Sequence, residues 1–310
     1  MGAYLESSNG TGVNSGAQAD DSETYSGAVY IFRYSASTWA QEAYIKASNT
    51  EAGDYFGRSV ALSSDGNTLA VGADGEDSNG TGGNSGAQAD NSVDDAGAVY
   101  LFRYSASTWA QEAYIKASNT GARDRFGRSV ALSSDGNTLA VGAYTESSNG
   151  TGVNSGAQAD NSVSESGAVY LFRYSASTWA QEAYIKASNT GENYFGSPVA
   201  LSSDGNTLAV GSQGDSSNGT GVNSGAQADN SEATSGAVYL YRYSASTWAQ
   251  EAYIKASNTE GGDSLGYSLA LSSDGNTLAA GAGDSSNGTG VNSSAQADNS
   301  ERYSGAVYLY

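Results

Sequence analysis

The sequence predicts an all-β protein, a β-propeller of four-stranded antiparallel blades with about four blades per chain. The only four tryptophans, Trp39, Trp109, Trp179 and Trp248, recur every 70 or 69 residues, and the text around them repeats almost letter for letter. A period of this length is too long for one solenoid coil and suits a propeller blade with long loops. No segment shows a sustained 3.6-residue apolar period, so almost no helix is expected.

Each unit contains four short runs that read as strands, named A to D in chain order. In the third unit they are predicted at residues 129–133, 137–142, 168–174 and 179–186. All are rich in β-branched or aromatic residues and are bounded by Gly, Ser, Asn or Asp, as strands are. Asp135-Gly136 predicts a type I′ turn between A and B. Pro198, the only proline, falls in strand A of the fourth unit, which predicts that A is an edge strand. Glu182 and Lys186 are interpreted as charges that protect an exposed outer strand D.

No change in composition divides the chain, so residues 1–310 are predicted to be a single repeat domain. Its units are a partial one at 1–50, blades at about 56–118, 126–188 and 195–257, and a last one at 265–310. The last unit lacks a strand D and the first lacks a strand A, so we expect the N- and C-terminal strands to share one closing blade. One strand C is then surplus, either Gly27–Tyr34 or Gly305–Tyr310. Such a strand is expected to be displaced or to pair with another molecule, which would give self-association.

The composition excludes several function classes. The chain has no cysteine and no histidine, which rules out disulfides, thiolate zinc sites, cysteine nucleophiles and histidine-dependent triads within it. The net charge of −20 argues against nucleic acid and anionic membranes as partners. No apolar run is long enough to insert into a membrane. Residues 1–6 match residues 141–146 of a repeat rather than a signal peptide, so the sequence alone leaves the localisation open.

Two acids recur in every B–C loop, the connection between strands B and C, and calcium is the one cofactor they suggest. One stands three residues before an Asn-Gly-Thr and the other follows Gln-Ala. They are Glu6, Asp20, Glu76, Asp90, Glu146, Asp160, Asp215, Asp229, Asp284 and Asp298. Calcium takes several carboxylate, amide and carbonyl oxygens, and a folded-back loop could bring both acids to one ion. The plainer alternative is that they form Asx turns that order a glycine-rich loop.

Differences between the units gather in the B–C loops and in the D–A loops, which join one unit to the next. Strand parity places both loop types on one face, opposite the nearly invariant A–B and C–D turns. We therefore predict a binding face on a constant scaffold. Its candidate residues are Asp54, Tyr55, Asp94, Asp95, Arg123, Arg125, Glu165, Asn193, Tyr194, Glu232, Asp263 and Arg302. The alternative is that loops diverge freely because they tolerate change.

The chain resembles the FG-GAP repeat, which forms the propeller of integrin α subunits and of bacterial surface proteins. The resemblance rests on Phe126-Gly127-x-Ser129, on Val141-Gly142-Ala143 and on Gly167-Ala168-Val169-Tyr170, which recur in that order through the chain. It implies an extracellular or cell-surface protein that works in adhesion or ligand binding. The proline of the family's name is absent after Ala143. The family's calcium loop between strands A and B is also absent, because Ser133-Ser134-Asp135-Gly136 is too short to surround an ion.

These observations favour a non-catalytic binding or scaffold protein that recognises a protein or glycan through its loop face. The near-identity of the units equally fits an engineered or recently amplified repeat with no evolved ligand. A carbohydrate-active enzyme is the lesser alternative, because the acids repeat around the units instead of forming one asymmetric pair of carboxylates.

Overall fold

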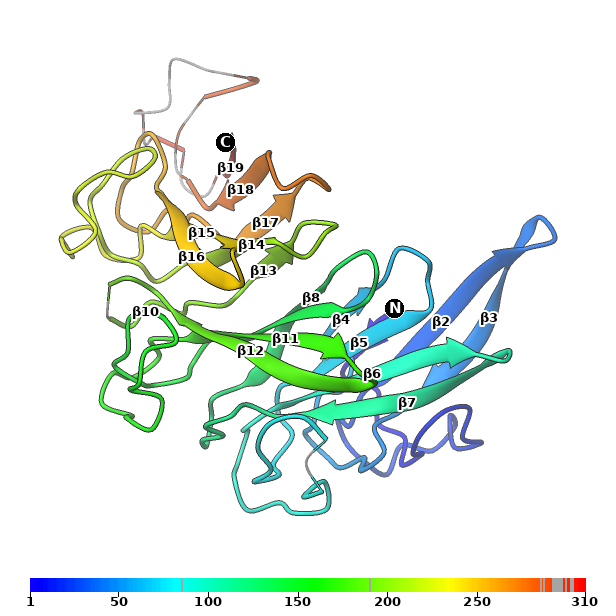
Figure 1. Ribbon diagram of the computed structural model, residues 1–310. Coiled ribbons are helices and arrows are strands. Elements are labelled where there is room, and N and C mark those ends of the chain that lie inside the picture. The colour runs from blue at the N-terminus through cyan, green and yellow to red at the C-terminus, as the bar shows by residue number, and fades with distance from the viewer. Residues whose placement is uncertain are drawn as a thin grey trace. The chain divides into compact units, whose positions relative to one another are not determined.

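The computed structural model describes residues 1–84, 86–189, 191–284, 286, 288–291, 298, 300–301 and 304–310, and it forms an all-β propeller of five blades with three to five strands each (Figure 1). The first blade has the order β1 (Gly2–Ala3), β2 (Ala28–Ser35) and β3 (Thr38–Ile45). The second has the order β4 (Ser59–Leu62), β5 (Thr68–Ala73), β6 (Ala98–Ser105) and β7 (Thr108–Ile115).

The other three blades repeat this arrangement. The third has the order β10 (Gly152–Val153), β12 (Thr178–Lys186), β11 (Ala168–Ser175), β9 (Thr138–Ala143) and β8 (Phe126–Leu132). The fourth contains β13 (Val199–Leu201), β14 (Thr207–Ser212), β15 (Ala237–Ser244) and β16 (Thr247–Ile254). The fifth contains β17 (Ser268–Leu271), β18 (Leu278–Ala282) and β19 (Ala306–Leu309).

The prediction of about four blades is wrong, and so is the shared closing blade. Each of the five copies of strand C has its own strand B, because even Gly2 and Ala3 pair with Val29 and Ala28. The N-terminal strands β1–β3 and the C-terminal strands β17–β19 therefore belong to different blades. Neither copy of strand C is left over as a surplus strand.

The strand assignments within a unit are confirmed, and so is the edge position of strand A, which ends its sheet in the second to fifth blades. The predicted type I′ turn is wrong. Only Gly136 of the Asp135-Gly136 pair has a positive φ, of 68°. The carboxylate of Asp135 accepts the Ser133 hydroxyl at 2.6 Å and the Asn137 N–H at 3.0 Å. This side-chain bonding closes a longer turn, in which Ser133 and Thr138 form the last backbone pair.

Strand D is not the bare edge that its charges suggested, because the B–C loop returns along its end. Gly152 and Val153 pair with Lys186 and Ile185, and single bridges take the same place in three other blades. The lysine that ends strand D is buried in every copy and not an exposed edge charge; the copies are Lys46, Lys116, Lys186 and Lys255.

Successive blades are joined where the D–A loop meets the start of strand C. Gly27 forms a parallel bridge with Phe56 of the next blade, and three further Gly–Phe or Gly–Leu pairs repeat it. A Cβ atom on Gly27 would lie 2.0 Å from the Phe56 carbonyl oxygen, and its φ is +81°, so only glycine fits. Phe56 is completely buried beside Val29, Ile45 and Tyr100.

The chain divides into two compact units. The first comprises Met1–Glu146 with Tyr170–Glu182, and the second comprises Ser147–Val169 with Ala183–Tyr310. Within the described residues there is no helix with the length and apolar character needed to cross a bilayer.

Candidate ligand-binding face

The first acid of each B–C loop lies at the centre of a buried polar network. In the second blade, Glu76 accepts Lys116 Nζ at 2.7 Å, Tyr114 Oη at 2.7 Å and the Ser78 hydroxyl at 3.0 Å. Asn49, from the preceding D–A loop, donates to the same carboxylate at 3.0 Å. Glu76 is 1% exposed and Lys116 is fully buried, and this burial lowers the pKa of the lysine. A buried carboxylate must be paired in this way to avoid a large desolvation cost.

The same arrangement recurs along the chain. The lysine reaches the acid at 2.8 Å in the Glu6–Lys46 pair and at 3.3 Å in the Asp215–Lys255 pair. The asparagine of the preceding loop reaches the acid in three more copies, Asn119–Glu146, Asn189–Asp215 and Asn258–Asp284, at 2.9–3.1 Å. Burial raises the pKa of Asp215, but Lys255 and the Ser217 hydroxyl outweigh it, so this pKa is lowered.

The second acid of each B–C loop forms an Asx turn. Asp20 accepts the Ser22 hydroxyl at 2.6 Å and the Ser22 N–H at 3.0 Å, and these bonds lower its pKa. The same serine contacts recur at Asp90, Asp160 and Asp229, and the backbone contact recurs at Asp298. Among the described residues, no group of three or more acidic side chains could hold a metal ion. The calcium site stays a prediction without support from this geometry, and the arrangement matches the plainer alternative of Asx turns.

The end of each B–C loop and the following D–A loop run side by side and form a loop ribbon. Its crest is a pair of residues that are both in the left-handed region, such as Asp95 at φ 52° and Arg125 at φ 59°. Their backbones are joined because the Arg125 N–H donates to the Asp95 carbonyl at 3.1 Å. The four crest pairs are Tyr25–Tyr55, Asp95–Arg125, Glu165–Tyr194 and Thr234–Ser264.

The side chains of the crest pairs match one another, although every pair is chemically different. Tyr25 and Tyr55 stack with their ring centroids 6.2 Å apart. Asp95 and Arg125 form an ion pair at 2.8 Å. In the second unit, Tyr194 Oη donates to Glu165 at 2.5 Å, and the Ser264 hydroxyl donates to the Thr234 carbonyl at 3.4 Å. The variable letters of the two loops therefore vary together, as pairs in contact.

A third position adds charge and aromatic surface beside the first two crest pairs. The guanidinium of Arg58 lies 4.4 Å from the centre of the Tyr4 ring, and that of Arg128 lies 5.3 Å from the centre of the Tyr144 ring. Arg128 also reaches Asp74 at 3.5 Å. The Asp74 side chain is 4% exposed, and burial raises its pKa against the opposing effect of the arginines.

The predicted face residues fall into three groups. Asp94 and Arg123 are exposed, while Tyr55, Asp95, Arg125, Glu165, Tyr194 and Glu232 are half-buried. Asp54, Asn193 and Asp263 are buried at 4–5% exposure, so they support the loop from within. Arg302 lies outside the described residues. The sequence prediction missed Tyr25, Thr234 and Ser264, although each stands 30 residues from its partner or is that partner.

Asp54 shows why the buried group is structural. Its Oδ2 accepts the Glu51 N–H at 3.0 Å, and Asp263 accepts the Glu260 N–H at 2.9 Å in the same way. Burial, with a smaller contribution from nearby acids, raises the pKa of Asp54 to about 8. Burial raises the pKa of Asp263 to about 6. The fourth unit carries the uncharged Asn193 at this position.

Comparison with known proteins identifies the repeat. The FG-GAP repeat family model matches residues 39–88, 109–172 and 179–228, together more than half of the chain. No curated protein matches the sequence. Among solved structures, one described as "a putative 6-phosphogluconolactonase from Bacteroides uniformis" is similar with a TM-score of 0.47 and 12% identity. The match covers 83% of this chain and 58% of that one, so the chain spans less than two thirds of that structure's length.

We expect Lys116→Met to lower the free energy of unfolding by about 3–5 kcal/mol, because it leaves the Glu76 carboxylate buried without its cation. Adding Glu76→Gln should recover much of the loss. The matched control is Arg103→Met, which breaks the partly exposed Arg103–Glu112 pair and should cost about 1 kcal/mol. Urea denaturation measures all four proteins, and equal losses for Lys116→Met and Arg103→Met would contradict the central role of the buried pair.

Replacing Asp95 and Arg125 together by tyrosine, which recreates the Tyr25–Tyr55 pair, should be less damaging than the two single changes predict. We expect a coupling energy of about 0.5–1 kcal/mol in a double-mutant cycle, because each single change leaves one partner unmatched. The control cycle combines Asp95→Tyr with Ser37→Asn in a C–D turn. If both cycles are additive, the crest pairs are not energetically matched.

The buried Asp54 should make stability depend on pH. Its folded pKa of about 8 lies above the unfolded value of about 3.9, so the stability it contributes is present below pH 4 and is lost as pH rises toward 8. Asp54→Asn should therefore raise Tm at pH 8–9, with a gain that shrinks on acidification. For Asp263→Asn the gain should be complete by about pH 6. Calorimetry from pH 4 to 9 checks both variants, and a gain independent of pH would refute the assignment.

Proposed function

This chain belongs to the FG-GAP repeat family, and we propose that it is a non-catalytic binding or scaffold protein that recognises a ligand through its crest pairs. The observation that carries the proposal is the contrast within the loop ribbon. The backbone bonds of the ribbon are the same in four copies, while the side chains at its crest change from aromatic to charged to small. A fixed frame with variable, partly exposed side chains is the general form of a recognition surface.

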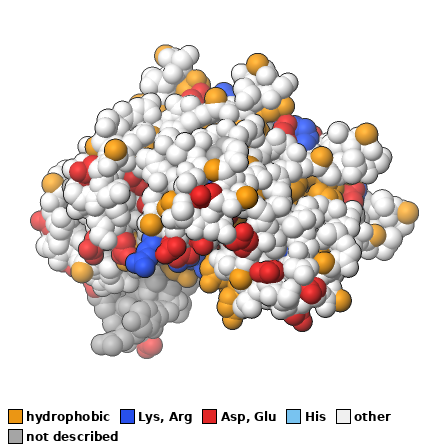
Figure 2. Space-filling view, turned by 90° about the horizontal axis from the view of Figure 1, so that it is seen from below, with side chains coloured by type: hydrophobic (Ala, Val, Ile, Leu, Met, Phe, Trp, Pro, Cys, Tyr) orange, Lys and Arg blue, Asp and Glu red, His pale blue; other side chains and the backbone are white. Residues whose placement is uncertain are grey.

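The surface chemistry indicates the kind of ligand. The chain carries a net charge of −20, and acidic side chains dominate the charged groups on the face drawn in Figure 2. The stacked tyrosines and the Arg58–Tyr4 contact add flat aromatic surface at the first crest pair. A neutral glycan or a basic protein surface fits this combination better than an anionic ligand does. In line with the family, we propose that recognition takes place outside the cell or at its surface.

A repeat without an evolved ligand is the second candidate, and the near-identity of the units favours it. In that case the crest pairs serve only to hold neighbouring loops together. A carbohydrate-active enzyme is a weaker candidate, because the first acid of each B–C loop is committed to the buried network in every copy.

A glycan and protein array tests the proposal with three proteins. The first is the native chain. In the second, the first three crest pairs are replaced by Thr–Ser pairs, which copy Thr234–Ser264. In the third, the exposed C–D turn serines Ser37, Ser107, Ser177 and Ser246 are changed to Asn, which tolerates their positive φ.

We expect a ligand that binds the native and C–D turn proteins and loses at least tenfold in affinity for the crest variant. Binding that survives the crest changes would reject the crest as the site. Absence of any ligand would favour the repeat without an evolved ligand. Turnover on a glycoside panel, abolished by Asp→Asn changes in the loops, would favour the enzyme.

A further inference from the structure

The first blade leaves one edge of its strand C partly unpaired beside an apolar groove. Strand β1 is two residues long, so it covers β2 only at Ala28 and Val29, with Met1 adding bonds to Tyr30. In the second blade, β5 covers β6 as far as Arg103, and the Tyr104 N–H donates to the Asn67 carbonyl. From Ile31 onward, no such partner lies along this edge of β2 within the described residues.

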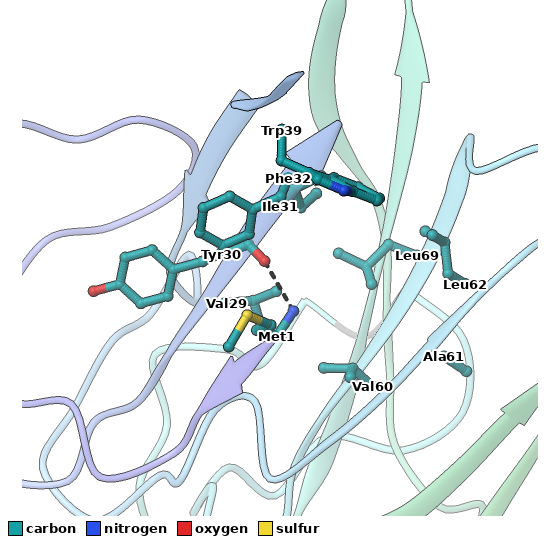
Figure 3. A pocket seen from close by; sticks show the side chains of 10 residues that line it. All are labelled: Met1, Val29, Tyr30, Ile31, Phe32, Trp39, Val60, Ala61, Leu62 and Leu69. Atoms are coloured by element: carbon teal, nitrogen blue, oxygen red, sulfur yellow. Dashed lines mark hydrogen bonds between the residues drawn. The ribbon is translucent and has the colours of Figure 1, made fainter. Parts of the chain in front are cut away.

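The groove begins where β1 ends. It has a volume of about 510 Å³ and lies between β1–β3 and the start of the second blade (Figure 3). Its lining includes Ile31, Phe32 and Trp39 on one side and Val60, Leu62 and Leu69 on the other. Phe32 is 42% exposed and Trp39 is 68% exposed, whereas their counterparts Phe102 and Trp109 are 0% and 4% exposed. These side chains have the composition of a blade core but no cover.

Three other blades show what covers the same edge. There the strand C sequence Leu-Phe-Arg, or Leu-Tyr-Arg, faces Thr-Leu-Ala of strand B. In the second blade the register is Thr68↔Arg103, Leu69↔Phe102 and Ala70↔Leu101, and the fourth blade repeats it. The arginine marks the register, because its Nη1 donates to the threonine hydroxyl at 3.0–3.2 Å in all three blades.

Arg33, at the same place in β2, still holds its acid, with Nε 2.8 Å from Glu42. Its threonine partner is missing from the described residues. We propose that the β2 edge and this groove form a strand-acceptor site, which binds an extended segment of another polypeptide that carries Thr-Leu-Ala as the second strand of an A–B type hairpin.

The side chains of the site fit such a segment in one register. Successive residues of a strand face opposite sides of the sheet. With the threonine on Arg33, the leucine lies opposite Phe32 and covers it, as Leu69 covers Phe102. The alanine then faces the second blade near Val60 and Leu69, where the buried Ala70 and Ala140 show that a small residue belongs. The added strand also takes up the free backbone groups of β2, as in other cases of strand addition to a sheet edge.

The probe is a peptide with the sequence of Arg128–Ala140, which contains strand A, the turn and Thr-Leu-Ala of the third blade. Trp39 reports binding, because the other three tryptophans are 4% exposed. We expect a saturable blue shift of emission and protection from acrylamide. A peptide with the Leu139→Asp change should bind about tenfold more weakly or worse, since it loses the burial of one leucine. Phe32→Asp in the protein should weaken binding equally, and Tyr267→Asp, at a 70% exposed site outside the groove, should not.

A second measurement removes the difficulty that a free hairpin is poorly ordered. The same peptide is fused directly before Met1, which recreates the internal connection of Ala140 to Val141. The fusion should raise Tm and protect Trp39, and a Leu139→Asp fusion should do neither.

Three results would overturn the proposal. The first is equal behaviour of the two fusions, and the second is peptide binding that is indifferent to Leu139→Asp. The third is a concentration-dependent dimer of the native chain, seen by light scattering, in which Trp39 is already protected, because the occupant would then be a second copy.

Discussion

The structure depends on one buried carboxylate per blade, placed where strand B ends. It is held from three directions at once: by the lysine of strand D, by the tyrosine two residues earlier in that strand, and by an asparagine from the preceding blade. A charge such as Glu76, 1% exposed, tolerates the loss of none of these partners cheaply. The network therefore fixes how the B–C loop leaves the sheet, how strand D ends and where the previous loop lies. This explains why those letters hardly change between units.

What the network leaves free is the crest of the loop ribbon. There the backbone is set by the Gly–Phe bridge and by two residues with positive φ, so the frame does not depend on the side chains. Each side chain still meets its partner across the ribbon, and a tyrosine therefore accompanies a tyrosine, and an arginine an aspartate. A ligand at this face would contact matched pairs and not independent residues. The same pairing also stabilises the contact between neighbouring blades, so recognition and stability share these residues.

Much of the fold can be predicted from the sequence, because the signals are local and repeated. The tryptophan period, the Val-Tyr alternation of strand C and Pro198 together predict the strands and the edge position of A. The blade number could not be predicted, because Gly2–Ala3 is too short to show a strand pattern and is a strand only through Val29. Lys186 was taken for an edge charge because alternation cannot show that a distant loop folds back over strand D. The crest pairs were missed as pairs, although comparing positions 30 residues apart in this one sequence would have revealed Tyr25 with Tyr55 and Asp95 with Arg125.

The two terminal blades carry the network in unequal forms. Glu6 has its lysine at 2.8 Å and its tyrosine at 3.0 Å, but within the described chain no asparagine reaches it. Asp284 has the opposite set, because Asn258 and Tyr308 donate to it and no strand D supplies a lysine within the described residues. Asp284 is 1% exposed, so its charge is held by neutral donors alone. Hydrogen bonds to a carboxylate stabilise less than a cation and hydrogen bonds together. The first blade therefore lacks a link to a neighbouring blade, whereas the last blade lacks the charge balance within its own network.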